Sequence, residues 1–405
     1  MSDARELAAS FDPERLPPEF FENPYPTYAA LRELDPAHRC PDGSIFLTRH
    51  ADLSAVYRDR MHFSSDKQTV FAPKFGTGTP LYEHHTSSLV FNDPPYHTRV
   101  RRQIVGALTP AAIRGMVPGL EALVDDLCDE MEARRDADLI EHFAAAIPVE
   151  VIGNLLGVPR GERGPLRAWS LAILGALDPG LSPEQLALGQ RSVSEFLEFS
   201  RELVSDRRRH LRGEDDLLSR LIRDATGGEP LSERELLHNC IFLLNAGHET
   251  TTNLIGSGLA LLLADPAQRE RLESDTGMIT TAIEECLRME SPNQLGNRMV
   301  IEPVEIGGYR FEAGTYLTLC IGAANRDPRE FAHPDRFDVG REPNRHLAFA
   351  AGGHACAGMS VARIEGQIAI AGFLRRFPRA QLTGGAVRGL RARFRGYVRL
   401  PARVG

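Results

Sequence analysis

Lysine is almost absent from this chain. Of its 47 basic residues only Lys67 and Lys74 are lysines, and the others are arginines. We interpret this scarcity as a bias of composition without functional meaning. Acidic residues outnumber basic ones, and the net charge is −8. This balance argues against the basic surface that a nucleic-acid-binding protein needs, so we expect no nucleic acid among the partners.

Long apolar runs are missing as well. No stretch of about 18 apolar residues occurs, so the sequence predicts no membrane-spanning helix. Residues 1–15 are polar and lack the apolar centre of a signal peptide. We therefore expect a cytoplasmic protein. Linker-like stretches, repeats and low-complexity runs are also lacking, although a length of 405 residues would suit two or three domains.

Cysteine is sparse and scattered. The six cysteines are Cys40, Cys128, Cys240, Cys286, Cys320 and Cys356. Such wide spacing in a long chain predicts the reduced thiols of a cytosolic protein. No second cysteine lies near Cys356, which argues against zinc, because a zinc site usually needs four ligands at close spacing. No cysteine cluster suits an iron–sulfur centre either.

Hydrophobic periodicity indicates helices over most of the chain. Examples are residues 112–135, 162–177, 183–212 and 231–264. Strand patterns are few and short, and they cover residues 44–48, 304–311, 315–320 and 390–400. The sequence therefore predicts a mainly α protein with a minor β part.

Two of the strand patterns carry further predictions. Residues 304–320 predict a hairpin with turns at the glycines 307, 308 and 314. Near the C-terminus, Arg391, Arg393 and Arg395 alternate with Ala392 and Phe394. This alternation predicts a strand whose basic face is solvated.

The most informative segment is Phe-Ala-Ala-Gly-Gly-His-Ala-Cys-Ala-Gly at residues 349–358. It is a glycine-rich loop that presents one thiol, Cys356, ahead of an apolar helical stretch. A single cysteine is most often a small buried hydrophobic residue. The glycines do not form a phosphate cradle, because no Gly-Lys-Ser/Thr follows them. A lone thiolate held in this way suits one large metal cofactor that brings four ligands of its own.

This loop resembles the heme-binding loop of the cytochrome P450 family, and the resemblance extends over nearly the whole chain from about Phe20. It implies the cytochrome P450 fold, mainly α with a minor β part, as a single domain over residues 1–405. Residues 1–19 are expected to be a loosely ordered N-terminal segment. The implied cofactor is heme b, which would lie between a long oxygen-side helix and the helix that follows the cysteine loop. Cys356 would be the axial thiolate ligand of the iron, and Phe349 would contact the cofactor.

One position departs from the family pattern. The family usually has glycine where Ala350 stands. A Cβ atom restricts the backbone, so the turn before Cys356 is expected to differ in shape.

A second motif lies in the long helical segment at residues 231–264. Ser232 and Glu235 form a capping-box pattern at its start, and the helix would be about 50 Å long. Within it, Ala-Gly-His-Glu-Thr-Thr at residues 246–251 resembles the oxygen-activating motif of the family. This match predicts that the segment is the oxygen-side helix.

The members of this motif have separate expected roles. Ala246 and Gly247 are small enough for a flat macrocycle to approach the helix, so we assign both to the cofactor site. Thr250 can bond back to the carbonyl oxygen of Ala246 and loosen the helix locally. By the resemblance, Thr250 is the hydrogen-bond partner of bound oxygen and Glu249 is the proton shuttle. The alternative is that Glu249 is a surface acid and Thr250 a packing residue.

Charged residues elsewhere match supporting positions of the family. Glu285 and Arg288 match its Glu-x-x-Arg helix motif and are assigned a structural role in bracing the segment before the cysteine loop. Heme propionates need cationic donors. The residues that match such donors are His97, Arg101, Arg298 and His354.

The substrate pocket is also assigned by resemblance. Its expected residues are His85, Val90, Phe242, Asn245, Asn293, Leu295 and Phe394. The apolar members would form a wall, as is usual in ligand pockets. Asn245 has two open interpretations, because a buried amide needs partners. It either bonds Asn293, Gln294 or a water, or it orients a polar group of the substrate.

Together these residues predict a heme-thiolate monooxygenase that inserts one oxygen atom from O2 into a small organic substrate. Electrons are expected from a separate ferredoxin and ferredoxin reductase. Arg99, Arg102 and Arg363 flank the heme segments and would form a basic docking patch. Two alternatives remain open, namely a peroxide-driven peroxygenase and a non-catalytic heme sensor or carrier. Neither of them needs the relay of Thr250 and Glu249.

Overall fold

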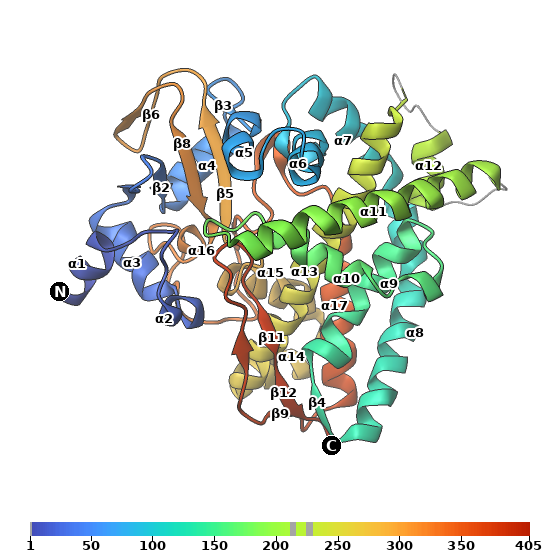
Figure 1. The fold of residues 1–405 in the computed structure, drawn as a ribbon. Helices are drawn as coiled ribbons and strands as arrows, with labels where there is room; N and C mark the ends of the chain where they lie inside the picture. The colour runs from blue at the N-terminus through green and yellow to red at the C-terminus, as the bar shows by residue number, and fades with distance from the viewer. Residues whose placement is uncertain (1, 211–215, 224–229) are drawn as a thin grey trace.

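The computed structural model describes residues 2–210, 216–223 and 230–405. Helices dominate it, and its largest sheet lies beside the N-terminal helices (Figure 1). The predicted mainly α fold with a minor β part is confirmed. The α-helices are α1 (Ser2–Ala9), α2 (Pro18–Glu22), α3 (Tyr25–Leu34), α4 (His50–Arg58), α5 (Gln68–Phe75), α6 (Pro80–Ser87), α7 (Tyr96–Ala107), α8 (Pro110–Arg134), α9 (Ala146–Leu155), α10 (Leu166–Gly175), α11 (Pro183–Arg209), α12 (Leu217–Arg223), α13 (Glu233–Ala264), α14 (Pro266–Ser274), α15 (Ile279–Met289), α16 (Ile321–Ala324) and α17 (Met359–Arg376).

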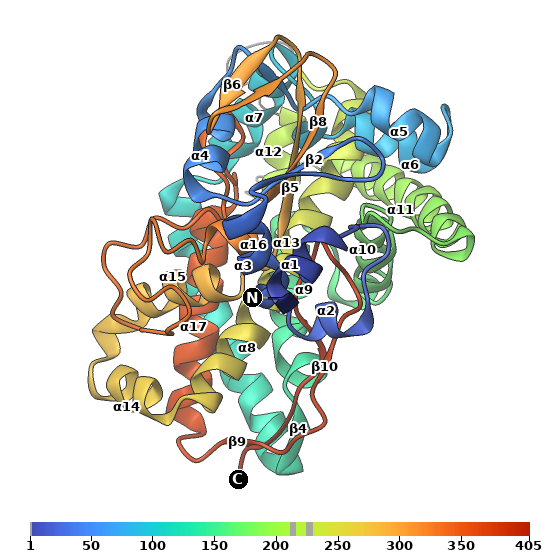
Figure 2. The ribbon, with the colours of Figure 1, turned by 90° about the vertical axis from the view of Figure 1, so that its left-hand side faces the viewer.

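Helix α13 is the central element of the fold, and α17 lies next to it (Figures 1 and 2). It begins as predicted, because the Ser232 side chain accepts a hydrogen bond from the amide of Glu235 and the Glu235 carboxylate accepts one from the amide of Ser232. Most of its 32 residues are buried. The part of the structure that is described contains no helix long and apolar enough to cross a membrane.

The other predicted helices shift at their ends. The range 112–135 became α8, and 162–177 became the shorter α10, because Pro165 stands at its start and residues 160–162 form a separate 3₁₀ turn. The range 183–212 became α11, which begins behind a capping box at Ser182 and ends at Arg209. The last two residues of that predicted range lie outside the described residues.

The strands form small sheets. Their bounds are β1 (Ala37–Arg39), β2 (Ile45–Leu47), β3 (Phe63–Ser64), β4 (Asp136–Asp138), β5 (Leu295–Val300), β6 (Val304–Ile306), β7 (Tyr309–Phe311), β8 (Tyr316–Cys320), β9 (Gln381–Leu382), β10 (Val387–Arg388), β11 (Tyr397–Arg399) and β12 (Pro401–Arg403). The largest sheet has the order β1-β2-β8-β5-β3, with β2 and β8 parallel. The sheet positions β5, which carries Arg298, beside β3.

Two predictions, about the hairpin and the C-terminal strand, were wrong. Only β6 and β7 pair as a hairpin, while β8 joins the large sheet because it finds partners in β2 and β5. Residues 390–400 are not one strand, since only β11 lies within that range. In the N-terminal segment, α1 forms a helix, and both Ala8 and Phe11 are buried in the N-terminal hydrophobic cluster.

The two largest hydrophobic clusters meet along α13. One contains Leu254 and Leu259 from its C-terminal half, and the other contains Leu237 and Leu244 from its N-terminal half. The polar segment around residues 245–253 lies between them. The motif predicted from the sequence therefore occupies the junction of the two cores, which is where a buried site can form without interrupting either.

Candidate active site

Two exposed positions occur at the centre of the fold. Ala246 is exposed although Asn245, His248 and Glu249 around it on α13 are buried. Cys356 is exposed as well, yet burial of its thiol within the protein raises its pKa. A residue that has exposed surface but is enclosed by the surrounding protein lines an internal hollow. We infer that Ala246 and Cys356 both face such a hollow between α13 and the loop before α17.

The loop that carries Cys356 has a tight backbone. The Cys356 amide donates to the carbonyl oxygen of Phe349 at 2.9 Å, and the Ala350 amide donates to that of Leu347 at 2.8 Å. Ala350 has φ of +54°, a left-handed conformation that favours glycine. The loop lies close to α4, because a Cβ atom on Gly352 would come within 2.0 Å of the carbonyl oxygen of Tyr57. Ala350 thus adopts the conformation for which the family's usual glycine is suited.

Cationic and imidazole side chains gather near this thiol. The rings of His97 and His354 stack with centroids 3.8 Å apart. Burial, followed by nearby cations, lowers the pKa of His97 to about 4 and that of His354 to about 2. Arg101 lies within electrostatic range of the Cys356 thiol. The four residues assigned to the propionates are therefore brought together.

This group of donors fits heme. Among the described residues neither Arg101 nor Arg298 has an ion pair with a carboxylate, and Nε2 of His97 is buried without a hydrogen-bond partner. Their chemistry therefore suits a group with two carboxylates beside a thiolate ligand. The same part of the chain contains no cluster of three or more His, Cys, Asp or Glu residues that would hold a metal ion by itself. A macrocycle with two carboxylates, which brings its own metal ligands, matches this set of donors.

Thr250 and Glu249 differ in their surroundings. The Thr250 hydroxyl donates to the carbonyl oxygen of Ala246 at 2.7 Å, which is the helix back-bond expected from the sequence. Glu249 is buried rather than on the surface. One of its oxygens, Oε1, accepts from Arg391, while Oε2 is buried without a partner. Burial raises the pKa of Glu249 to about 7, although Arg391 acts in the opposite direction.

Gly247 packs closely against helix α9. A Cβ atom at this position would lie 2.9 Å from Cδ1 of Ile152 on α9. Its small size therefore serves the close packing of α13 against α9. Only Ala246 of the two small residues is exposed toward the hollow.

The alternating arginines near the C-terminus are not a solvated face, so that prediction was wrong. Arg391 binds Glu249 and also donates to Asp178 at 3.1 Å. Arg393 donates to the carbonyl oxygens of Leu177 and Leu295 and to the side chain of Asn297. Arg395 is buried and pairs with Glu290 at 2.8 Å. Their acidic partners lie more than 100 residues earlier in the chain, which the local pattern did not reveal.

Glu285 and Arg288 form a fully buried ion pair, with contacts of 2.7 and 2.8 Å. Arg288 also donates to the carbonyl oxygens of Asn325 and Pro334, and Glu285 accepts from Arg341 and Asn344. These contacts hold the irregular segment between α16 and the cysteine loop.

Part of the predicted pocket comes together in one hydrophobic cluster. Phe242 packs against the cluster that contains Phe394, and Asn293 forms an isolated β-bridge with Phe394. His85 is buried against the rings of Phe71, Phe75 and Phe91. Val90 is half-buried in the 3₁₀ turn Leu89–Phe91.

Leu295 was assigned to this pocket, but it packs in the N-terminal cluster instead. It lies opposite Cys320 in the pairing of β5 with β8, and both side chains belong to that cluster. Opposite residues in a strand pair point to the same face. The register of the sheet therefore turns Leu295 toward the N-terminal helices.

Asn245 and Lys67 carry buried polar atoms without partners. Neither Nδ2 nor Oδ1 of Asn245 has a hydrogen-bond partner, so the alternative in which Asn293 or Gln294 satisfies the amide does not hold in this structure. Lys67, which sequence reasoning missed, is 2% exposed and its Nζ has no hydrogen-bond partner. The rarity of lysine was the available signal, and we had interpreted it as compositional bias.

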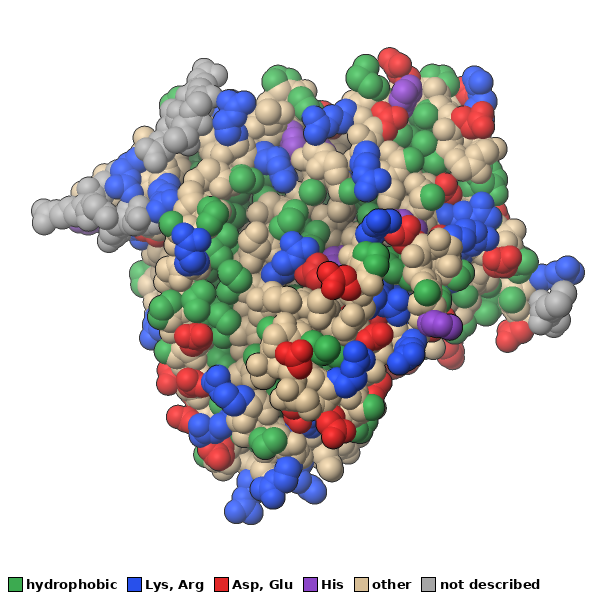
Figure 3. Space-filling view, turned by 180° about the vertical axis from the view of Figure 1, so that it is seen from behind, with side chains coloured by type: hydrophobic (Ala, Val, Ile, Leu, Met, Phe, Trp, Pro, Cys, Tyr) green, Lys and Arg blue, Asp and Glu red, His purple; other side chains and the backbone are tan. Residues whose placement is uncertain are grey.

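The predicted docking arginines are partly neutralised. Arg99 pairs with Glu235, and Arg363 pairs with Glu284 through two contacts of 2.7 Å. The face of the molecule in Figure 3 likewise has basic and acidic side chains interspersed.

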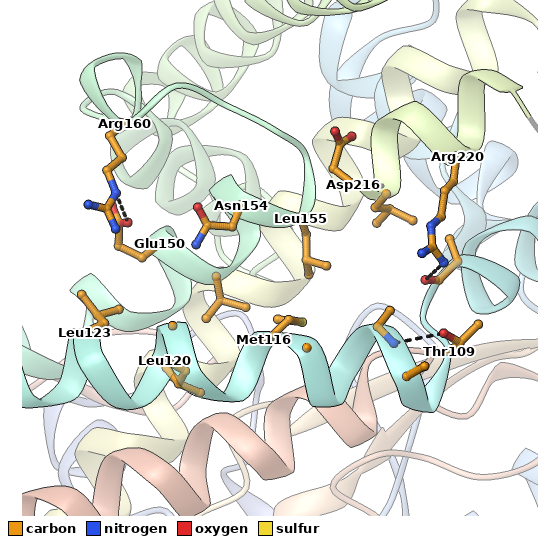
Figure 4. Close-up of a pocket in the computed structure, with 17 residues that line it drawn as sticks. Thr109, Met116, Leu120, Leu123, Glu150, Asn154, Leu155, Arg160, Asp216 and Arg220 are labelled. Atoms are coloured by element: carbon orange, nitrogen blue, oxygen red, sulfur yellow. Dashed lines mark hydrogen bonds and ion pairs between the residues drawn. The ribbon is translucent and has the colours of Figure 1, made fainter. Parts of the chain in front are cut away.

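A separate pocket of about 550 Å³ lies between α8, α9 and α12 (Figure 4). Its floor is apolar, with Met116 and Leu120, and Arg160 and Glu150 pair at 3.3 Å on its rim. None of the residues assigned to the cofactor or to the substrate lines it.

The chain is similar to known proteins in both sequence and fold. A family model described as Cytochrome P450 matches residues 181–386. The biotin biosynthesis cytochrome P450 of Bacillus subtilis is 34% identical over 380 residues, which cover 90% of this chain and 91% of that protein. The crystal structure of P450BioI in complex with hexadec-9Z-enoic acid ligated acyl carrier protein has a TM-score of 0.89 and 33% identity, and covers 95% of this chain and 99% of that one. The myxobacterial cytochrome P450 CYP267B1 in complex with myristic acid has a TM-score of 0.87 and 35% identity, with 96% and 98% covered.

Proposed function

This chain belongs to the cytochrome P450 family, and we propose that it inserts one oxygen atom from O2 into a small organic substrate with electrons from a separate ferredoxin. It is an oxidoreductase of the monooxygenase class, and heme is its cofactor. When bound, heme supplies the iron chemistry that activates O2. Cys356 would hold it through the thiolate, and Phe349 and Ala246 would contact it. The propionates would be held by Arg101, Arg298, His97 and His354.

The observation that carries the proposal is the pair of proton-holding groups on α13. Glu249 has a pKa of about 7 and an unpartnered Oε2, so this buried carboxyl group can take up and release a proton near neutral pH. The Thr250 hydroxyl is fixed by its bond to the Ala246 carbonyl oxygen. A positioned acid beside a positioned hydroxyl delivers protons into a site from which bulk water is excluded. A peroxygenase or a passive heme carrier has no need for such a delivery.

The ligands of solved relatives indicate which substrate class to test first. One of them was solved with an acyl chain on a carrier protein and another with myristic acid. Fatty acids and acyl carrier protein conjugates are therefore the first compounds to test. Phe242 packs against the hydrophobic cluster that contains Phe394, and in the proposed pocket these two residues would form an apolar wall that suits an aliphatic chain.

The direct test is turnover of the heme-loaded protein with isotopically labelled O2, NADPH, a surrogate ferredoxin and its reductase. We expect one labelled oxygen atom in the product and none without the ferredoxin. Product formation with peroxide alone, at the rate of the full system, would identify a peroxygenase. No product from any member of a fatty acid panel, together with no change of the heme spectrum on adding them, would contradict the proposed substrate class.

A variant tests the role of Thr250. Thr250→Ala should leave heme binding intact but divert electrons into peroxide, with a loss of ~10²–10⁴-fold in the product-forming step. Thr252→Ala is the matched control, since the Thr252 hydroxyl makes the same kind of back-bond, to His248 at 3.0 Å. If both variants kept the product yield per NADPH, Thr250 would have no part in proton delivery.

A further inference from the structure

Lys67 carries a buried ammonium group for which the protein provides no hydrogen-bond acceptor. Its side chain is 2% exposed, and Nζ has no hydrogen bond or ion pair with any residue in the described ranges 2–210, 216–223 and 230–405. Its polar contact is the ring of Tyr316, whose centroid lies 5.1 Å from Nζ. Burial of an ammonium group without an acceptor is strongly unfavourable. A ligand anion at this position would remove that cost.

The nearest acidic side chains are already occupied. Asp93 accepts from the hydroxyl of Ser64 through Oδ2 and from the amide of Ser65 at 2.9 Å through Oδ1. Asp66 accepts from the amide and the side chain of Gln68, at 2.7 and 3.2 Å. These bonds fix the turn between β3 and α5, in which Lys67 is the last residue before α5. The turn thus places the ammonium group but leaves it without a carboxylate of the protein.

Lys67 lies within electrostatic range of two of the proposed propionate donors, Arg298 and His354, but it contacts the opposite face of the large sheet from Arg298. Arg298 on β5 lies opposite Leu317 on β8, and Tyr316 is the residue before Leu317. Successive side chains of a strand point to opposite faces, so Tyr316 and Arg298 lie on opposite faces of the sheet. Lys67 contacts the Tyr316 face, while Arg298 lies over Tyr57 of α4 on the other.

Lys67 is linked to the residues assigned to the substrate pocket through Arg393. Arg393 lies within electrostatic range of both Lys67 and His85, and Phe394 follows it in the chain. Arg393 is already bonded to Leu177, Leu295 and Asn297. Lys67 is therefore a cation near this pocket whose ammonium group makes no hydrogen bond within the described part of the chain.

We propose that Lys67 binds the carboxylate of an acidic substrate and so selects carboxylic acids over their neutral analogues. The assignment rests on the proposed function, because it presumes that the neighbouring pocket receives the substrate. A carboxylate is the chemistry that fits, since one ammonium group buried among apolar and aromatic side chains neutralises one negative charge. The other carboxylates available in a loaded protein are the heme propionates, and the experiment below separates the two sources.

The pH dependence of binding supplies a second signature. Burial, together with Arg298 and Arg393, lowers the pKa of Lys67 to about 7, whereas Asp93 and Asp66 act in the opposite direction. A bound carboxylate favours the protonated amine. The affinity for an acid should therefore fall as the pH rises above about 7, because free Lys67 then has to take up a proton on binding. The affinity for an ester of the same acid should not change in this way.

The test uses the heme-loaded protein and the change in the heme spectrum on ligand binding. Decanoic, myristic and palmitic acids are titrated beside their methyl esters into the wild type and into Lys67→Met. We expect the wild type to prefer at least one acid over its ester, and Lys67→Met to lose that preference by ~10–100-fold. Lys74→Met is the matched control, because it removes the same charge from α5 but from an ammonium group that already donates to the Asp178 carbonyl oxygen at 2.6 Å.

A second arm measures transfer of heme to apomyoglobin. An unchanged transfer rate in Lys67→Met, with the acid preference lost, supports a substrate carboxylate. Faster heme loss with the acid preference retained assigns Lys67 to a propionate and overturns the proposal. Absence of any acid preference in the wild type overturns it too. None of these readouts needs turnover, so a failure of the proposed monooxygenase reaction would appear separately, as spectral binding without product.

Discussion

The carboxylate of Glu249 is paired with the guanidinium of Arg391, which lies 142 residues later in the chain. Arg391 is held in turn by Asp178, whose second oxygen accepts from the amide of Arg393 at 2.9 Å. The proposed proton shuttle on α13 is thereby connected to the C-terminal segment. Its proton affinity is set by burial, which raises the pKa, against Arg391, which lowers it.

Removal of Arg391 should change the pH at which Glu249 loses its proton. Arg391→Met takes away a cation that favours the carboxylate, so the pKa of Glu249 should rise above its present value of about 7. The decline of product yield per NADPH at high pH should move upward by about 1–3 pH units. Arg391→Lys keeps a positive charge and should move it less.

The control for this prediction is Arg399→Met, which removes an exposed arginine of the same segment. It should leave the pH profile unchanged. If Arg391→Met lowered activity equally at every pH, Arg391 would have a structural role only. Thermal unfolding of both variants distinguishes that outcome from loss of fold.

A second prediction concerns the loop before Cys356. Ala350 has φ of +54°, and a residue with a Cβ atom is disfavoured there by roughly 1–2 kcal/mol. Ala350→Gly should therefore raise the free energy of unfolding by about 1 kcal/mol, after the greater flexibility of glycine in the unfolded chain is subtracted. Denaturant titration of the heme-loaded protein measures it.

The neighbouring residue provides the control. Ala351 has φ of −149°, an extended backbone that any residue adopts. Ala351→Gly should gain nothing and lower the stability by roughly 0.5–1 kcal/mol. Equal effects of the two substitutions would show that the conformation of Ala350 carries no strain.

The features that the sequence predicted correctly are local ones. The start of α13 follows from Ser232 and Glu235, because a capping box involves only residues three apart. The back-bond of Thr250 to Ala246 follows from the helix alone. Such contacts are determined within one or two helical turns, so a single sequence is enough to predict them.

The features that could not be predicted from the sequence depend on residues far away in the chain. Arg391 and Arg395 looked like a solvated face because Glu249 and Glu290 cannot be paired with them without the fold. Leu295 was assigned to the pocket, but its register with Cys320 turns it elsewhere. The close packing of Gly247 against Ile152 likewise depends on the neighbouring helix α9. Long-range packing decided each case.

The third prediction concerns the cations proposed to hold the heme propionates. Arg298→Ala or Arg101→Ala should leave a carboxylate of bound heme without a charged partner, a loss of about 1.5–3 kcal/mol. Heme transfer to apomyoglobin should accelerate accordingly, while the spectrum of the remaining loaded protein stays that of a thiolate-ligated heme. Arg310→Ala is the control, since that arginine is exposed and pairs with Glu312. Arg298 and Arg101 would lie away from the propionates if transfer were as slow as in this control.

The last prediction concerns two asparagines on α13 that differ in their partners. Both ends of the Asn239 side-chain amide are hydrogen-bonded. Its nitrogen donates to the Tyr96 hydroxyl and to the Glu235 carbonyl oxygen, and its oxygen accepts from the amide of Leu89. Asn245 is as deeply buried, but both polar atoms of its amide lack partners. A polar side chain that costs stability in the free protein is retained where a ligand satisfies it. Asn239→Leu should therefore lower the free energy of unfolding by about 1–3 kcal/mol. Asn245→Leu should leave it unchanged or raise it.

The same substitution should have the opposite effect on binding. A substrate whose polar group is oriented by Asn245 should bind Asn245→Leu more weakly by about 1–3 kcal/mol, and the oxidised position should become less uniform. Spectral titration measures the affinity, and mass spectrometry of the products measures the position. Because stability and binding move in opposite directions only if the amide serves the ligand, a parallel loss of both would identify Asn245 as an ordinary structural residue.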